Sequence, residues 1–109
     1  MAHKRMDGRV AIVTGAAQGL GAAYARALAA EGAKVCVSDM LDAKPVAADI
    51  GKAGGDAIAA HCDVTDPKSV QAMVATTVKA FGSVDILVTN AVVSKLARQA
   101  ARHCHHRAL

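Results

Sequence analysis

Short apolar runs rich in β-branched residues alternate along this chain with longer stretches whose apolar positions recur at a helical spacing. The runs predict strands over residues 10–13, 34–38, 56–62 and 84–89. The stretches between them predict helices over 19–30, over 41–53 and from Asp66 to Gly82. Strands and helices in strict alternation predict an α/β domain with a parallel sheet and right-handed crossovers.

The first and third helices have the more distinct apolar faces. In the first, we expect the face against the sheet to hold Leu20, Ala23, Tyr24, Ala27 and Leu28. The third should begin at Asp66-Pro67, an N-cap followed by a proline, and end at Gly82. Its core face should hold Val70, Met73, Val74, Val78 and Phe81. The second helix is weaker, with Pro45 near its first turn.

A glycine cluster follows the first strand directly. Thr14-Gly15 is followed by Gly19 and Gly21, so the turn can close tightly and another group can approach its backbone. The first N–H groups of the next helix are unpaired and lie at its positive end, where a pyrophosphate fits. The pattern is neither G-x-G-x-x-G nor a P-loop. An ordinary glycine-containing turn remains the alternative.

Asp39 closes the second strand, 18 positions after Gly21. An acidic residue near this spacing accepts a hydrogen bond from the ribose 2′-hydroxyl of a dinucleotide. No Arg or Lys stands in the turn or directly after Asp39 to balance an extra phosphate, so NAD is favoured over NADP. The alternative is a helix N-cap or a turn aspartate.

These motifs together resemble the short-chain dehydrogenase/reductase family. Matches are Thr14-Gly15 with Gly19 and Gly21, then Asp39, then Asp63-Val64 after the third strand, and 87–91 after the fourth. The resemblance runs from about Gly8 to Ala91. It implies a partial Rossmann-like, doubly wound parallel sheet of about four strands in the order 3-2-1-4, with helices on both faces. It also implies an NAD site in which Asp63 and Val64 border the adenine ring. The implied site residues are Gly15, Gln18, Gly19, Leu20, Gly21, Asp39, Asp63, Val64, Asn90 and Ala91.

The family pattern breaks after Ala91. The family has a glycine where Val92 stands, and residues 92–109 carry four basic residues and no acid. The family's catalytic Tyr-x-x-x-Lys pair and its serine are absent, because the single tyrosine, Tyr24, lies in the first helix with Leu28 four positions on. We therefore expect an NAD-binding half-domain over 1–91 that does not catalyse, followed by an atypical basic, His-rich tail over 92–109. A non-catalytic nucleotide-binding or interaction module, or a non-functional, frameshifted or truncated product, is the alternative.

Charge, cysteines and hydropathy limit the partners. Residues 1–91 carry nine basic and nine acidic residues, so the net charge of +4 comes from the tail. Because this short basic tail has no aromatic residues that could stack on bases, the charge does not indicate nucleic-acid binding. Three cysteines without paired spacing indicate reduced thiols in the cytoplasm. No stretch is long enough to cross a membrane. The four adjacent residues 103–106, His-Cys-His-His, cannot all converge on one metal ion. The apolar fourth strand should leave an exposed edge, so we expect a weakly stable monomer; a homo-oligomer that buries this edge, or a partner that supplies the missing half, is the alternative.

Overall fold

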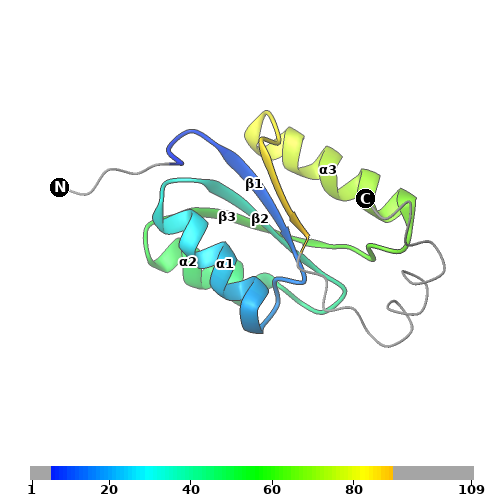
Figure 1. Ribbon diagram of the computed structural model, residues 1–109, viewed down its shortest axis with the longest axis horizontal. Helices are drawn as coiled ribbons and strands as arrows, with labels where there is room; N and C mark the ends of the chain where they lie inside the picture. Colours follow the sequence, from blue (N-terminus) through cyan, green and yellow to red (C-terminus); the bar gives the residue numbers. More distant parts are fainter. Residues whose placement is uncertain (1–5, 90–109) are drawn as a thin grey trace.

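The computed structural model of this chain describes residues 6–89 and shows three layers (Figure 1). Four parallel strands form the central sheet in the order β3-β2-β1-β4, which confirms the predicted order. The elements are β1 (Val10–Thr14), α1 (Gly19–Ala30), β2 (Lys34–Asp39), α2 (Lys44–Lys52), β3 (Asp56–His61), α3 (Pro67–Phe81) and β4 (Ile86–Thr89). Helices α1 and α2 cover one face of the sheet, and α3 covers the other.

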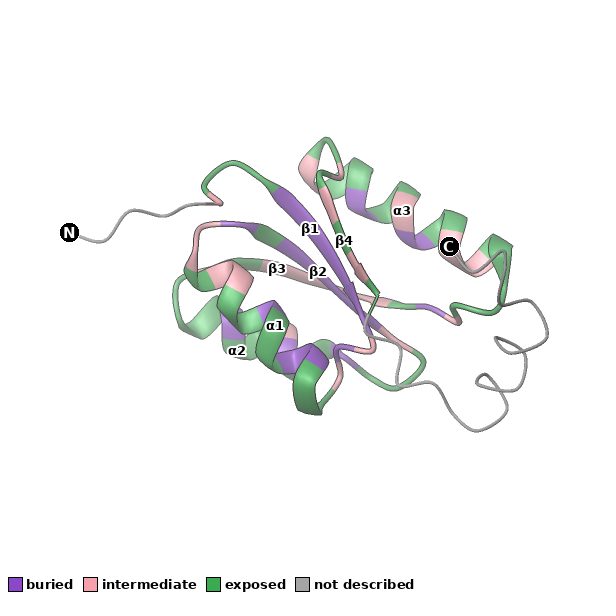
Figure 2. Cartoon of the chain, in the orientation of Figure 1, coloured by how far each residue is buried: buried purple, intermediate pink, exposed green. Residues whose placement is uncertain are grey.

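The core lies on the two central strands, where burial is most complete (Figure 2). Successive strand residues point to opposite faces, so neighbouring positions of β1 enter different clusters. Val13 packs with the alanines of α1 and with Val46 and Ile50 of α2. Ile12 packs on the other face with Cys36 and with Met73 of α3. No helix of residues 6–89 is both long and apolar enough to span a bilayer.

The predicted bounds of α1 are confirmed, but its predicted core face is wrong. The buried residues are Gly21, Ala22 and Ala25, whereas Leu20 and Tyr24 are 60% and 43% exposed. Ala23 and Ala27 are exposed as well, and only Leu28 of the predicted face is partly buried. The small residues face the sheet because they let the helix backbone approach it closely, and the large side chains then point away.

Helix α3 follows its prediction more closely. The carboxylate of Asp66 accepts a hydrogen bond from the N–H of Lys68 at 3.0 Å, which confirms the N-cap. Gly82 ends the helix in the left-handed conformation at φ 93°. Met73 is buried as predicted, but Val78 is exposed and Thr77 takes the inner position. Thr77 is tolerated there because its hydroxyl donates to the carbonyl of Met73 at 2.9 Å.

Helix α2 begins three residues later than predicted, at Lys44. Residues 41–43 form a turn instead, in which Asp39 accepts from the N–H of Leu41 and Asp42 accepts from that of Lys44, each at 3.0 Å. Such side-chain bonds to the backbone compete with helix formation. The turn places Met40 and Leu41 at the carboxyl edge of the sheet, beside the site described next.

Candidate functional site

The carboxyl ends of β1, β2 and β3 meet at one edge of the sheet, as parallel pairing requires. The loop after β1 turns sharply there: Gly15 has φ 63° and Gly19 has φ 61°, a region that residues other than glycine rarely adopt. The N–H of Ala16 donates to the carbonyl of Ser38 at 3.0 Å and holds this loop against the end of β2. The loop is therefore fixed beside the neighbouring strand.

The start of α1 is accessible to a ligand. Gln18, the N-cap residue, has extended backbone, and its side chain makes no capping hydrogen bond. A Cβ atom placed on Gly19 would meet no atom within 4 Å beyond its chain neighbours, so as far as residues 6–89 are concerned the space beside this turn is open. N–H groups in the first turn of a helix and its positive dipole end favour an anion. The turn thus fits a pyrophosphate in geometry and charge.

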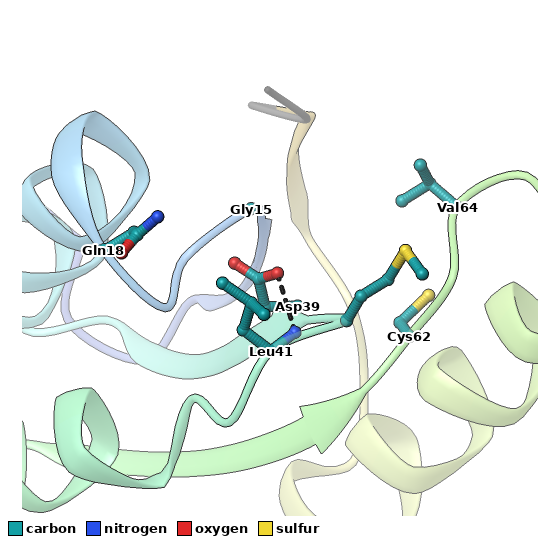
Figure 3. A pocket seen from close by; sticks show the side chains of 7 residues that line it. Gly15, Gln18, Asp39, Leu41, Cys62 and Val64 are labelled. Carbon is teal, nitrogen blue, oxygen red and sulfur yellow. Dashed lines mark hydrogen bonds between the residues drawn. The ribbon is translucent and has the colours of Figure 1, made fainter. Parts of the chain in front are cut away.

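A cavity of about 400 Å³ opens beside this turn (Figure 3). Three segments line it: the loop after β1, the end of β2 with the residues after it, and the loop after β3. The lining residues are Gly15 and Gln18, then Asp39, Met40 and Leu41, and then Cys62 and Val64. Met40 and Leu41 are 60% and 57% exposed, and Val64 is 43% exposed. The described residues thus supply apolar walls with a single carboxylate, which suit a flat ring joined to a polyol.

Among the described residues that line this cavity, Asp39 carries the charge. One carboxylate oxygen, Oδ2, accepts from the N–H of Ala17 at 2.9 Å, and the other, Oδ1, accepts from the N–H of Leu41 at 3.0 Å. Figure 3 shows the second of these bonds at the edge of the cavity. A carboxylate has about four lone-pair sites, so about two stay available to outside donors. The carboxylate is thereby oriented by the backbone and still able to bind hydroxyl groups.

Asp63 follows Cys62 on the loop after β3. Its Oδ1 accepts from the hydroxyl of Thr65 at 2.6 Å and from the N–H of Thr65 at 2.9 Å. These hydrogen bonds, the hydroxyl bond foremost, hold the pKa of the Asp63 carboxyl below its usual value. The Asp63 N–H donates to the hydroxyl of Ser69 at 2.9 Å, which ties the loop to α3. The carboxylate is therefore anionic and fixed at neutral pH.

The structure brings most of the predicted site residues to this edge. Gly15, Gln18, Asp39 and Val64 line the cavity, Gly19 and Leu20 begin α1, and Asp63 lies between two lining residues. Gly21 is buried, where it allows α1 to approach the sheet. Asn90 and Ala91 lie outside the described residues, as does the His-Cys-His-His run of the tail.

Met40, Leu41 and Cys62 also line the cavity, although no sequence motif identifies them as site residues. Their signal is positional, since they directly follow the ends of β2 and β3. Tyr24 is not among the lining residues. Within residues 6–89, no group of three or more His, Cys, Asp or Glu residues could hold a metal ion.

Known proteins share both sequence and fold with this chain. A 2,5-dichloro-2,5-cyclohexadiene-1,4-diol dehydrogenase of Sphingobium indicum is 47% identical over 89 residues, 80% of this chain and 36% of that protein. A D-threitol dehydrogenase of Mycolicibacterium smegmatis is 47% identical over 97 residues, 85% of this chain and 36% of that protein. The crystal structure of a hydroxysteroid dehydrogenase from Escherichia coli superposes with a TM-score of 0.77 at 40% identity, covering 79% of this chain and 37% of that one.

The chain thus spans about a third of the length of the relatives that it matches. A family model described as short chain dehydrogenase matches residues 9–106, so the resemblance extends beyond Ala91, where the predicted resemblance ends. Proteins of this family are oxidoreductases that use nicotinamide dinucleotide cofactors. By the extent of this match and by its closeness to these relatives, the chain belongs to the short-chain dehydrogenase family.

Proposed function

We propose that residues 1–91 bind NAD, with the pyrophosphate at the turn between Gly15 and Gly21 and the adenosine in the cavity beside Asp39. In this arrangement Asp39 accepts hydrogen bonds from the ribose hydroxyls, and Asp63 and Val64 border the adenine. Asn90 and Ala91 would border the nicotinamide side. The observation that carries the proposal is Asp39, held by two backbone N–H groups beside an open helix start.

Asp39 also supports NAD over NADP. Its carboxylate would repel the 2′-phosphate of NADP, and none of the described residues that line the same cavity is basic. Lys44 and His61 line a neighbouring cavity that shares Met40 and Leu41 with the first. A phosphate reaching that cavity could pair with Lys44, so a test of cofactor preference must include this residue.

Binding constants for NAD and NADP, measured by calorimetry on the full chain, test the proposal. The unchanged protein should bind NAD more tightly, and Asp39→Asn should reduce the NAD-over-NADP preference about tenfold or more, because hydrogen bonds to a charged acceptor are lost and the repulsion disappears. Lys44→Ala should leave the preference unchanged. Failure of both nucleotides to bind would overturn the proposal, and a preference for NADP that Lys44→Ala abolishes would reassign the cofactor.

We propose further that this part of the chain does not itself transfer the proton that accompanies hydride transfer. Tyr24, the one tyrosine, is on α1 and does not line the cavity. Incubation with NAD and a panel of alcohols should therefore give no reduced nucleotide under conditions where NAD binds. Reduction that survives Tyr24→Phe would mean that another residue performs the step.

The proposed setting is the cytoplasm, supported by two free, buried thiols, Cys36 and Cys62. We propose self-association through β4 as well, because within residues 6–89 this strand pairs with β1 alone. Residues 92–109 remain a proposed separate tail.

A further inference from the structure

Large apolar side chains that are exposed in residues 6–89 fall into two groups. One group lines the cavity described above and consists of Met40, Leu41 and Val64. The other group does not line it and consists of Leu20, Tyr24, Val78 and Leu87. These four residues come from α1, α3 and β4. Exposed apolar side chains that gather on one side of a molecule mark an interaction surface.

On α1, Leu20 and Tyr24 face away from α2. Arg26 points toward α2, because its guanidinium pairs with Asp49 at 3.1 Å. A helix turns by about 100° per residue, so Tyr24 lies about 160° and Leu20 about 120° around the axis from Arg26. Helix α2 contacts β2 and β3, so the opposite side of α1 faces over β4.

On the other face of the sheet, Val78 and Leu87 lie on this same side. Ser69 of α3 points toward β3, since its hydroxyl accepts from the N–H of Asp63 in the loop after β3. Val78 is nine residues further on, about 180° around the helix axis, and therefore faces away from β3 and toward β4. Leu87 points to the α3 face, because its register partner Ile12 belongs to the cluster under α3. Both layers thus present apolar side chains on the side of the molecule that ends at β4 (Figure 1).

A second copy paired through β4 would leave these helix flanks uncovered as far as residues 6–89 reach. Helix α1 lies over β1 and β2, about two strand spacings, or about 10 Å, from a two-fold axis at the edge of β4. The two α1 helices would then be about 20 Å apart, whereas packed helices are about 8–10 Å apart. Helix α3 lies no nearer to β4, because it contacts β1, β2 and β3. What fits this side is a polypeptide that adds a strand to β4 and a helix to each face.

We propose that this side of the molecule docks another polypeptide, equivalent to the part of the short-chain dehydrogenases that this chain does not match. The match covers 36% of the D-threitol dehydrogenase and 36% of the diol dehydrogenase, so most of each relative lies outside it. A segment of that size can supply a strand and two helices. The inference goes beyond the proposed NAD function and does not depend on it. Self-association through β4 uses the same strand, so this partner should displace it.

The test co-expresses the full chain with the unmatched part of the Mycolicibacterium smegmatis D-threitol dehydrogenase, supplied as a separate, tagged polypeptide. The amount of chain that co-purifies is measured without nucleotide, so a failure of NAD binding does not affect it. The matched segment of that enzyme, expressed in place of the chain, is the reference, and the chain should reach at least about a tenth of it. Tyr24→Lys and Val78→Lys should each reduce the co-purified amount about tenfold or more, because a charge replaces an apolar side chain that the partner buries. Ala72→Lys, at an exposed position of α3, should not reduce it.

Self-association of the chain alone, measured by sedimentation equilibrium, separates this partner from a second copy. Tyr24→Lys and Val78→Lys should leave self-association unchanged, and its loss in both variants would overturn the inference in favour of a second copy. Absence of co-purification would also overturn it. The same holds if the reference pair fails to form, since the two parts of a relative would then not associate as separate chains, and if Ala72→Lys reduces co-purification equally. Tyr24→Ser and Val78→Ser repeat the comparison without added charge where a lysine variant does not fold.

Discussion

Cys36 lies at the centre of the sheet, fully buried on β2 and facing α3. Burial raises the pKa of its thiol above the ordinary value of 9.0, a nearby Cys62 raises it further, and a hydrogen bond with Thr77 opposes both. The folded state thus favours the neutral thiol. Its contribution to stability is complete below pH 9.0 and is lost as the pH rises toward the folded pKa.

Replacing Cys36 should therefore change the pH dependence of stability. We expect Cys36→Ala to lower the free energy of unfolding by about 1 kcal/mol at pH 7, since it removes a buried atom. Above pH 9 the free energy of unfolding of this variant should fall less steeply with pH than that of the unchanged protein. Urea denaturation at pH 7, 8, 9 and 10 measures both. Val35→Ala removes volume from the same strand but no titrating group. The pH profile of its free energy of unfolding should therefore run parallel to that of the unchanged protein. If the profile of Cys36→Ala is parallel too, the thiol has no such role.

For single residues, the sequence predicts which ones lie at the site but not the hydrogen bonds that orient them. The glycines at 15 and 19 and the acid at 39 follow local rules, because turn geometry and strand ends are properties of short segments. The bond from the Ala17 N–H to Asp39 joins residues 22 positions apart and exists only once β1 and β2 are paired. Cavity walls such as Cys62 are predictable only once the strand ends are known.

Between elements, Asp85 fastens β4 to β1. Its N–H donates to the carbonyl of Val10 at 2.8 Å, and its carboxylate accepts from the N–H of Val10 at 2.9 Å. Val10 is only 2% exposed, so that N–H would have little access to water without the carboxylate. The pair fixes the point at which β4 begins to run beside β1.

Asp85→Ala should destabilise the protein by about 1–3 kcal/mol, the cost of leaving a buried donor without an acceptor. Asp85→Asn keeps an acceptor oxygen and should lose less. Urea denaturation at pH 7 gives both values. The matched control is Asp56→Ala, which removes an exposed aspartate from the start of β3 and should cost little. Equal losses for Asp85→Ala and Asp56→Ala would contradict the role assigned to Asp85.

Helices α1 and α3 show when a hydrophobic pattern is sufficient. In α3 the residues that separate the apolar positions are mostly polar, so the pattern identifies Met73 correctly and is wrong chiefly at Val78. Helix α1 consists mostly of alanine and glycine, with four larger residues among twelve. Because alanine fits either side, the large residues Leu20 and Tyr24 dominate the pattern, yet close contact with the sheet requires the small ones.

For the whole molecule, alternation of strands and helices predicts the layers correctly, and the strand order follows from the family resemblance. The local pattern says less about what covers β4. Its first three residues, Ile86, Leu87 and Val88, are apolar, and an unbroken apolar run is typical of a strand covered on both faces. In residues 6–89, however, Leu87 is 54% exposed, although its register partner on β1, Ile12, is fully buried. Which residues pack on the faces of β4 depends on segments distant in the sequence, so it cannot be predicted from the residues of β4 alone.

Leu87 therefore tests the proposed self-association through β4. An apolar side chain on a strand with one unpaired edge favours pairing with another chain, and burying a leucine contributes about 1.5–3 kcal/mol. Leu87→Lys removes this contribution from both copies and adds repulsion, so we expect at least a tenfold weaker dimer in sedimentation equilibrium. Ala72→Lys adds the same charge at an exposed position of α3 and should leave association unchanged. A monomer at every concentration of the unchanged protein would contradict the proposal, and equal weakening by both variants would show that net charge, not the β4 surface, controls assembly.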